Sequence, residues 1–448
     1  MLPIDVISIS VSIHDFKNYF EEVLGMRARI ECLDDGREHA EIRAPEVFRS
    51  VLYPICSGIN SINRIDQLAK DKDILSVTGT KQISARTIGR SFAGMRVEQL
   101  VELLSARSRA EIAQCCNPQC KAKAIFDMSQ QFGKKAVVAT YYCKRHLIIA
   151  TIGVEFLTEA EAHEDERKKG EGESKAATRL LPRVEKEFGR WIYEYTADGY
   201  YTYWFAELIR KYKKHFTLKT HEENLQIVQQ AHDQIEYLYY SGVKAERLTP
   251  ASWISEDRYK AYEAFDTDFI TFHSDTGKSP YDGKEYRIVM SVEKYLSKSQ
   301  RKRATETVYT MTSIPSWEAP AKEIVQTRRD EWRIEVNVFK ELSEKMASKL
   351  GDHFFKINDN SKKCVFIVAL IARDLLYGYR RYKIQIPSLT ARHKKDVTII
   401  RISRCLLNTW LPKKSGAGRP RTRIRTDFIN IHKTQEPLKR TKPQPLNN

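Results

Sequence analysis

Apolar and polar residues alternate between positions 122 and 156, a pattern typical of strands with one buried and one exposed face. Turn-forming residues separate three such runs, which are Ala122 to Met128, Ala136 to Tyr142 and Leu147 to Phe156. The turn around Phe132-Gly133-Lys134 is short, so the first two runs predict a β-hairpin. The three runs together predict an antiparallel meander.

Helical and strand-like spacing then follow one another. From Glu159 to Glu173, charged residues surround two glycines, which predicts a solvated loop. After it we expect a helix, a strand, a helix and a strand at Lys175 to Glu187, Trp191 to Thr196, Tyr203 to Tyr212 and His215 to Lys219. This is the element order of a ribonuclease-H-like α/β core, in which the first and fourth strands are neighbours.

The rest of the chain divides into flanking regions. Residues 1–112 have mainly helical spacing and predict a helical DNA-binding or accessory domain. Residues 220–317 predict a β-rich insertion that separates the first part of the core, 113–219, from a second part, 318–412. A basic tail follows at 413–448.

Within these regions, individual elements are also predicted. Strand-like runs lie at Tyr286 to Val292 and Thr305 to Thr312, and Phe269 to His273 is a third candidate. An apolar run from Val365 to Tyr377 predicts a helix, and Val397 to Trp410 has strand or helix character.

The net charge of the chain indicates a polyanionic partner. The 448 residues include 75 Lys or Arg against 58 Asp or Glu, a formal charge of +17, and the pI is about 9.3. Such an excess favours nucleic acid, with a basic protein that binds none as the alternative. Eight cysteines are too few for a disulfide framework, and there is neither a secretory signal nor a membrane-spanning run. We therefore expect a cytoplasmic, nucleoid-associated protein.

Three carboxylates stand where a chain normally has apolar residues. Asp127 lies on the first predicted strand, Asp198 follows the fourth, and Glu335 lies between Ile334 and Val336 on a predicted helix. Charged groups are rare at such positions unless they are paired or bind metal. Oxygen ligands suit Mg²⁺ or Mn²⁺.

Several basic and aromatic residues are candidate DNA contacts. A short helix with a Ser cap is predicted between Gln82 and Arg90; it could enter a DNA groove or serve only as a packing helix. The tail segment from Gly416 to Arg421 could be a minor-groove arm or a disordered terminus that binds any phosphate backbone. The candidates are Arg86, Arg90, Lys219, Arg329, Arg333, Arg419 and Arg421 for phosphates, and Trp317 or Trp253 for stacking on a base, with a core role as the alternative for either tryptophan.

Three segments carry a family resemblance. The first is Ile125 to Ser129, followed by Gly133-Lys134-Lys135. The second is Ala197 to Tyr201, followed by Phe216 and Lys219. The third consists of Arg329, Trp332, Ile334-Glu335, Phe339 and Leu342, and the strand Tyr309 to Pro315 precedes it. In this order they resemble the DDE transposases of bacterial insertion sequences, in the group that has a β-strand insertion between the second Asp and the Glu. The resemblance extends from about residue 40 to about residue 410.

The resemblance implies a two-metal-ion DDE transposase that cleaves DNA at transposon ends and transfers the strands into target DNA. Asp127, Asp198 and Glu335 would be its catalytic, metal-binding residues, and a homodimer would hold two terminal inverted repeats. The chain departs from the group's pattern at three positions. The group often has a Tyr where this chain has Arg328, an Arg where it has Glu331, and a Lys where it has Leu342. Arg333 is a candidate substitute for the missing Arg.

Cysteines and a histidine also form a candidate zinc site. Cys116-x3-Cys120 and Cys143-x2-His146 have ligand-like types and short spacings. If the first two strands pair around the predicted turn, Cys120 lies opposite about position 145, and the four side chains meet at the open end of the hairpin. Buried free thiols beside a surface histidine are the alternative, and Cys115 is a spare ligand.

Two other functions remain open from the residues alone. A catalytically silent DNA-binding protein derived from a transposase would keep the basic surface and lose the chemistry. A tyrosine recombinase would use Tyr379 or Tyr382, which lie among arginines, but it would leave the three carboxylates without a role.

Overall fold

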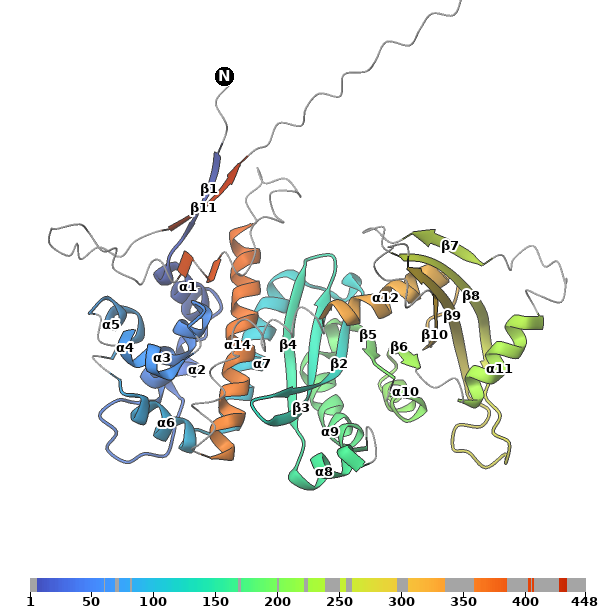
Figure 1. The fold of residues 1–448 in the computed structure, drawn as a ribbon, viewed down its shortest axis with the longest axis horizontal. Helices are drawn as coiled ribbons and strands as arrows, with labels where there is room; N and C mark the ends of the chain where they lie inside the picture. Colours follow the sequence, from blue (N-terminus) through green and yellow to red (C-terminus); the bar gives the residue numbers. More distant parts are fainter. Residues whose placement is uncertain are drawn as a thin grey trace, which may run out of the picture.

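The computed structural model of the protein has helices on both faces of a central mixed sheet (Figure 1). None of the helices it describes is long and apolar enough to cross a membrane. The structure describes residues 6–59, 61–68, 72–80, 83–167, 171–199, 201–220, 225–237, 250–254, 260–295, 305–334, 358–384, 402–403, 405–406 and 427–432.

The central sheet has nine strands in the order β4-β3-β2-β5-β6-β10-β9-β8-β7. Strands β2, β3 and β4 form the predicted antiparallel meander, and β5 and β6 run parallel to β2. The strands are β2 (Ala122–Gln131), β3 (Lys134–Cys143), β4 (Ile148–Phe156), β5 (Ile192–Ala197), β6 (His215–Thr220), β7 (Ala251–Ile254), β8 (Lys260–Thr271), β9 (Glu285–Tyr295) and β10 (Thr305–Thr312).

The first hairpin turns where the sequence predicts. Gln131 pairs with Lys134, which leaves a two-residue turn of Phe132 and Gly133. Both have positive φ, 54° and 70°, as the turn favoured by twisted hairpins requires. This turn fixes the register of β2 against β3 and therefore decides which side chains meet at the two ends of β2.

Strands β7–β10 extend the central sheet, because β10 pairs with β6 of the core. Strand β8 is longer than the candidate run at Phe269 to His273, and β7 was not predicted. A bulge between Asp266 and Phe269, with Asp268 at φ 55°, interrupts the alternation within β8. That interruption explains why the sequence pattern indicated only part of the strand.

Two hydrophobic cores lie on opposite faces of the sheet. Ala124 and Phe126 pack with α9 (Glu171–Phe188) and α10 (Tyr203–Arg210). Ile125, between them in sequence, packs on the other side with α14 (Asp359–Lys383). Such alternation along β2 is what the period of a strand requires when both faces are buried.

The N-terminal helices pack on α14, which contacts α3, α6, α7 and β4. The Ser-capped helix predicted around Gln82 to Arg90 is confirmed as α6, because the Ser84 hydroxyl accepts from the backbone N–H of Thr87 at 3.1 Å. The helices are α1 (Ile13–Asn18), a π-helical turn (Tyr19–Val23), α2 (Arg27–Glu31), α3 (Ala44–Cys56), α4 (Ile62–Leu68), α5 (Lys72–Thr78), α6 (Ala85–Gly94) and α7 (Val97–Cys115).

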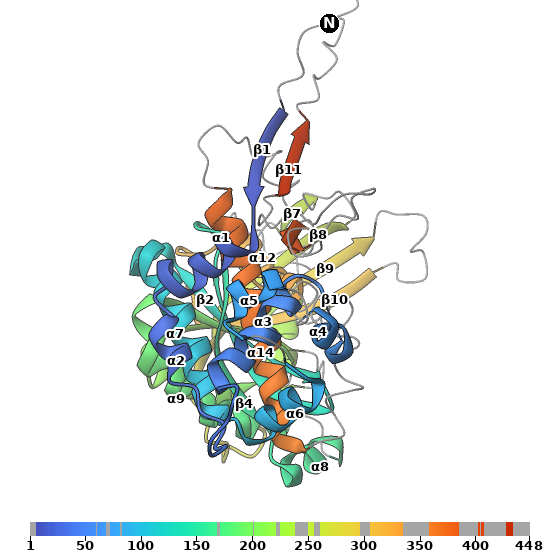
Figure 2. The same ribbon diagram turned by 90° about the vertical axis from the view of Figure 1, so that its left-hand side faces the viewer.

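Two parts of the fold differ from the prediction. The stretch predicted as a solvated loop is instead helix α8 (Glu159–Arg167) and the beginning of α9, which pack together. Residues of the N-terminus and of the basic tail form an antiparallel pair, β1 (Val6–Val11) with β11 (Asp427–His432). Figure 2 shows this pair projecting away from the helices. Helices α11 (Gln226–Ile235) and α12 (Ala321–Ile334) complete the described elements of the C-terminal half.

Candidate metal centres at the two ends of one strand

The first two predicted carboxylates are level with each other, Asp127 in the middle of β2 and Asp198 directly after the end of β5. The last parallel pair in the register is Phe126 with Ala197, so the residues that follow, Asp127 and Asp198, occupy neighbouring positions. Adjacent strands are about 4.8 Å apart, which brings two carboxyl groups within reach of one ion. Both residues are half-buried.

Lys219 continues the same row. Ala197 pairs with Leu218 of β6, so Lys219 is level with Asp198 on the next strand. Because neighbouring register positions share a face, the two carboxylates and the ammonium group lie on one side of the sheet. Lys123, four residues before Asp127, lies on that side too, and its Nζ contacts Thr327 Oγ1 of α12. The row therefore lies on the face of the sheet that α12 covers in part.

A third carboxylate near these strand ends was missed from the sequence. Glu173, near the start of α9, is buried, and burial raises its pKa to about 7, with smaller contributions from the charges of Asp198 and Asp165. Burial, and after it the charge of Glu173, raises the pKa of Tyr201, and Asp127 and Asp198 add to that shift. Asp127, Asp198, Glu173 and Tyr201 thus form one electrostatically linked group.

One glycine in the sequence is a signal for the burial of Glu173. Gly172 lies directly before it, and a Cβ on Gly172 would be 2.2 Å from the carbonyl oxygen of Glu161. Such a close approach indicates a tight contact between two helices, here α8 and α9, rather than a flexible loop. A glycine required for packing was interpreted as a loop signal.

The third predicted carboxylate, Glu335, lies outside the described residues. The described part of helix α12 extends to Ile334, the residue directly before it in the sequence. Earlier in α12, Arg328 stands where the transposase group often has a Tyr. Its guanidinium pairs with the buried carboxylate of Glu293 on β9, and Arg329 lies over the Tyr262 ring at 5.0 Å. Both arginines are therefore partly engaged in holding α12 on the sheet.

The other predicted contacts are distributed over the surface. Arg86 and Arg90 are exposed on α6, and Trp317 is 84% exposed between β10 and α12. Trp253 instead stacks on Tyr262, with ring centroids 5.1 Å apart. The side chain of Arg333, and the whole of Arg419 and Arg421, lie outside the described part of the chain. Tyr379 is fully buried, which removes it as a candidate recombinase nucleophile.

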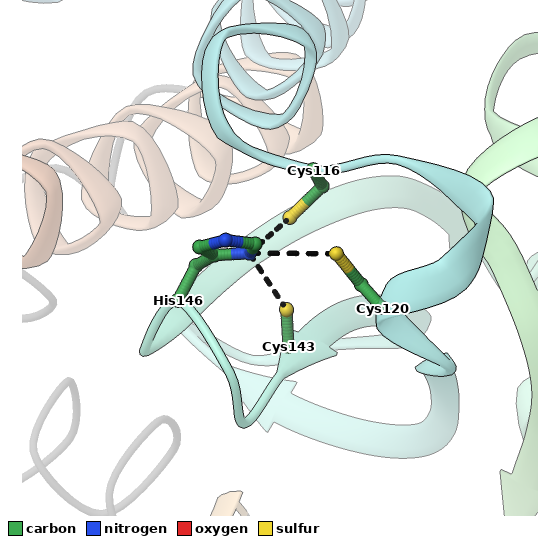
Figure 3. A group of neighbouring side chains, drawn as sticks. All are labelled: Cys116, Cys120, Cys143 and His146. Carbon is green, nitrogen blue, oxygen red and sulfur yellow. Dashed lines mark hydrogen bonds between the residues drawn. The ribbon is translucent and has the colours of Figure 1, made fainter.

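At the start of β2, the four predicted soft ligands come together, as predicted (Figure 3). Cys116 follows α7, Cys120 lies just before β2, Cys143 ends β3, and His146 lies in the turn before β4. Their ligand atoms all lie within 4.8 Å of one another. This Cys3His cluster could bind a metal ion such as zinc.

Distances within the cluster match a tetrahedral ion. The Nδ1 atom of His146 is 3.5 Å from the Sγ atoms of Cys116, Cys120 and Cys143. Zinc bonds of about 2.3 Å to sulfur and 2.05 Å to nitrogen, at tetrahedral angles, would separate these atoms by about 3.6 Å. A single ring nitrogen has one hydrogen or one lone pair, so it cannot satisfy three sulfurs by hydrogen bonding. A central cation explains the arrangement better than three hydrogen bonds do.

The backbone shape brings the ligands into place. Lys121 and Leu147, each directly after a ligand, have positive φ of 46° and 54° and bend the chain at the cluster. The pairing of β2 with β3 ends at Lys123 and Tyr142, and Cys120 lies in a 3-10 turn before it, so the turn and not the strand register positions Cys120. Cys115 does not join the group, because its Sγ accepts a hydrogen bond from Arg381 Nη1 at 2.8 Å.

One thiol of the cluster is already acidic. A hydrogen bond from Cys116, and after it the interactions with His146, lower the pKa of Cys143 to about 5 against the opposing effect of burial. The thiolate is the form that binds metal, so the cluster has a ligand ready at neutral pH.

Comparisons with family models and with curated sequences found no match. No protein-family model matches the chain, and no curated protein matches its sequence. Function is therefore inferred from the geometry of the two centres and from the charge around them.

Proposed function

We propose that the protein is a metal-dependent DNA strand transferase of the DDE type, a transposase that cuts at element ends and joins them to target DNA. The observation that carries this proposal is the juxtaposition of Asp127, in the middle of β2, and Asp198, directly after the parallel strand β5. Two carboxylates held in this way would repel each other strongly unless a proton or a cation lay between them.

The strand order supports a ribonuclease-H-like core. In the part of the sheet with the order β4-β3-β2-β5-β6, the strands β2, β3 and β4 are antiparallel neighbours, and β5 and β6 run parallel to β2. Helix α9 connects β4 to β5, and α10 connects β5 to β6. Because many functions share one fold, the proposal depends on the carboxylates and not on this order alone.

The residues have separate roles in the proposed reaction. Asp127 and Asp198 supply oxygen ligands of the kind that Mg²⁺ or Mn²⁺ prefers, and Glu335 would complete the set from the segment after α12. Bound ions would activate a water or DNA hydroxyl and stabilise the leaving oxygen. Lys219, level with Asp198, would hold the charge of the scissile phosphate. Glu173, with a pKa of about 7, would be protonated in about half of the molecules at neutral pH and would lose that proton when a cation draws close.

The Cys3His cluster is proposed to hold a structural zinc ion. Four protein ligands would fill a tetrahedral site and leave no position for a substrate. The ion would tie the end of α7 to the start of β2 and to the turn before β4. The strand that carries Asp127 would then be fixed at its start.

Exposed basic and aromatic groups fit a DNA partner. Arg86 and Arg90 on α6 are available to phosphates, and Trp317 is available to stack on an unpaired base. Joining two element ends requires two active centres, so a homodimer on paired terminal repeats is the proposed assembly, acting in the bacterial cytoplasm on nucleoid DNA.

The test is cleavage of DNA that contains the ends of the protein's own element. Duplexes that cover the sequence on either side of its gene would be incubated with the zinc-loaded protein and Mg²⁺. We expect strand breaks at fixed positions, with free 3′-hydroxyls, and none with Asp127→Asn. Cleavage that survives this substitution would contradict the DDE assignment, and specific binding without cleavage would favour the catalytically silent alternative.

A further inference from the structure

A groove of about 530 Å³ lies between the Cys3His cluster and α12. One wall comes from Cys120, the start of β2 and the turn after β3, and the other from α12 and the residues just before it. It opens on the face of the sheet that carries Asp127, because Lys123 lines the groove and shares a face with that carboxylate.

The groove is positively charged. Five cations line it against two acids: Lys121, Lys123, Lys144, Arg145 and Lys322 against Glu323 and Asp330. Lys121 Nζ lies 3.0 Å from Glu318 Oε1, and Lys123 Nζ lies 3.7 Å from Glu194 Oε2. Lys144 and Arg145 are adjacent and exposed, and neither forms an ion pair with a carboxylate among the described residues. Two exposed cations in one groove would attract a polyanion.

The cation positions are linked to the Cys3His cluster. Lys144 and Arg145 are the two residues between the ligands Cys143 and His146, and Lys121 directly follows the ligand Cys120. An ion bound by these ligands would fix the loop that carries the cations and reduce the entropy lost when they bind a partner. The cluster would therefore control binding by ordering the loop that carries the cations.

The distance to the carboxylates fits a nucleic-acid backbone. Four residues of strand separate Lys123 from Asp127, about 13 Å at 3.3 Å per residue. This equals the rise of about four base pairs of duplex DNA. A duplex with one phosphate near Asp127 and Asp198 would have its flanking phosphates at the groove.

We infer that this groove binds the phosphate backbone of duplex DNA beside the cleavage position, and that metal in the Cys3His cluster organises it for that purpose. The choice of DNA as the polyanion rests on the proposed function. The cluster then has a role in substrate binding in addition to bracing β2.

Salt-dependent binding of a short fluorescent duplex to the zinc-loaded protein, without Mg²⁺, tests the groove. For Lys144→Ala/Arg145→Ala we expect affinity at physiological salt to fall at least about tenfold and the salt dependence to become shallower by about two phosphate contacts. The matched control is Lys186→Ala/Lys211→Ala, which removes two exposed lysines on α9 and just after α10, beyond the opposite face of the sheet. Equal affinities for the two double variants would overturn the inference, as would tighter binding of an acidic polypeptide than of DNA.

Metal dependence is tested by comparing zinc-loaded and chelator-treated protein, with circular dichroism to verify that the chain stays folded. Removing zinc should weaken binding of the wild type about as much as the double substitution does, and should have little further effect on Lys144→Ala/Arg145→Ala. An equal loss in both proteins would overturn the metal link. Neither experiment requires DNA cleavage. The binding inference can therefore be confirmed even if the transposase proposal is wrong, and it can be contradicted even if that proposal is right.

Discussion

The start and the middle of β2 carry two groups of side chains with different ligand atoms. At its start, Cys120 joins two more thiols and an imidazole in a cluster with four protein ligands and no open position. Level with its middle, Asp127 and Asp198 present hard oxygen ligands in a row with the ammonium group of Lys219. Soft, complete ligand sets suit structural zinc, whereas few oxygen ligands with room for substrate suit catalytic Mg²⁺.

Different parts of one strand can therefore serve stability and catalysis. Zinc at the start of β2 would hold the strand against α7 and the β3–β4 turn, so that the carboxylate part of the strand need not contribute to stability. The carboxylate part of the strand can then keep neighbouring acidic groups and the buried Glu173, whose charged form costs stability. Variants in the two parts should therefore have different consequences.

The largest effect is expected in the carboxylate part of the strand. Asp127→Asn should reduce DNA cleavage at least about a thousandfold, or about 4 kcal/mol in activation free energy, because it removes a charged metal ligand and leaves the shape unchanged. Single-turnover cleavage in Mg²⁺ measures this, with DNA affinity measured in parallel. The control is Asp275→Asn, an exposed residue between β8 and β9, which should cleave at the wild-type rate. A comparable loss in both variants would remove the special role of Asp127.

Next is the effect of breaking the cysteine end. Cys116→Ser should lower bound zinc from about one ion per chain and lower Tm by about 5 °C or more, because a structural metal contributes its binding free energy to folding. Elemental analysis and thermal unfolding measure the two effects. Cys115→Ser is the matched control, since this neighbouring thiol bonds Arg381 and not the cluster. If Cys116→Ser retains zinc and stability like the control, the cluster is a group of free thiols.

A third effect depends on pH and belongs to the carboxylate part of the strand. The pKa of Glu173 is about 7 in the folded chain against an ordinary value of 4.5, so the folded state binds this proton more tightly than the unfolded state. Stability should fall as pH rises from about 4.5 to 7, by up to about 3 kcal/mol, and stay low above that range. Glu173→Gln should remove this loss, so its gain in Tm over the wild type should appear above pH 4.5 and level off near pH 7.

Thermal unfolding across this pH range, without divalent metal, checks the prediction. Glu159→Gln, an exposed carboxyl on α8, should follow the wild type throughout. A constant difference between Glu173→Gln and the wild type at every pH would contradict the raised pKa.

The smallest effect concerns Lys219. Lys219→Ala should weaken DNA binding or raise KM about fivefold, close to 1 kcal/mol, because one charge-assisted phosphate contact is lost. Steady-state cleavage measures it, and Lys211→Ala on the opposite face is the control. An unchanged KM with a reduced kcat would instead indicate that Lys219 acts only in the transition state.

Much of this arrangement follows from local sequence pattern. The meander of β2 to β4 and the strands β5 and β6 were predicted because period-2 alternation and a Gly-containing turn are local signals. The Cys3His cluster followed from the same turn, since the hairpin brings the start of β2 to the end of β3. Asp127 and Asp198 were recognised because each interrupts or ends an apolar strand.

The features that the sequence did not predict depend on contacts between distant segments. Glu173 is buried by the packing of α8 on α9, a tertiary contact that charge-rich sequence conceals. Strand β1 pairs with β11 from the other end of the chain, so neither strand has a local partner. Arg328 has a role that its helix does not suggest, because its partner Glu293 lies on β9.

The central claim is that the start and the middle of β2 hold different metals, and one paired measurement tests it. Zinc content by elemental analysis and Mn²⁺ binding by electron paramagnetic resonance would be measured on the same samples of wild type, Cys116→Ser and Asp127→Asn. We predict that Cys116→Ser loses zinc and still binds Mn²⁺, whereas Asp127→Asn keeps zinc and loses Mn²⁺ affinity. Undiminished Mn²⁺ binding by Asp127→Asn would contradict the account.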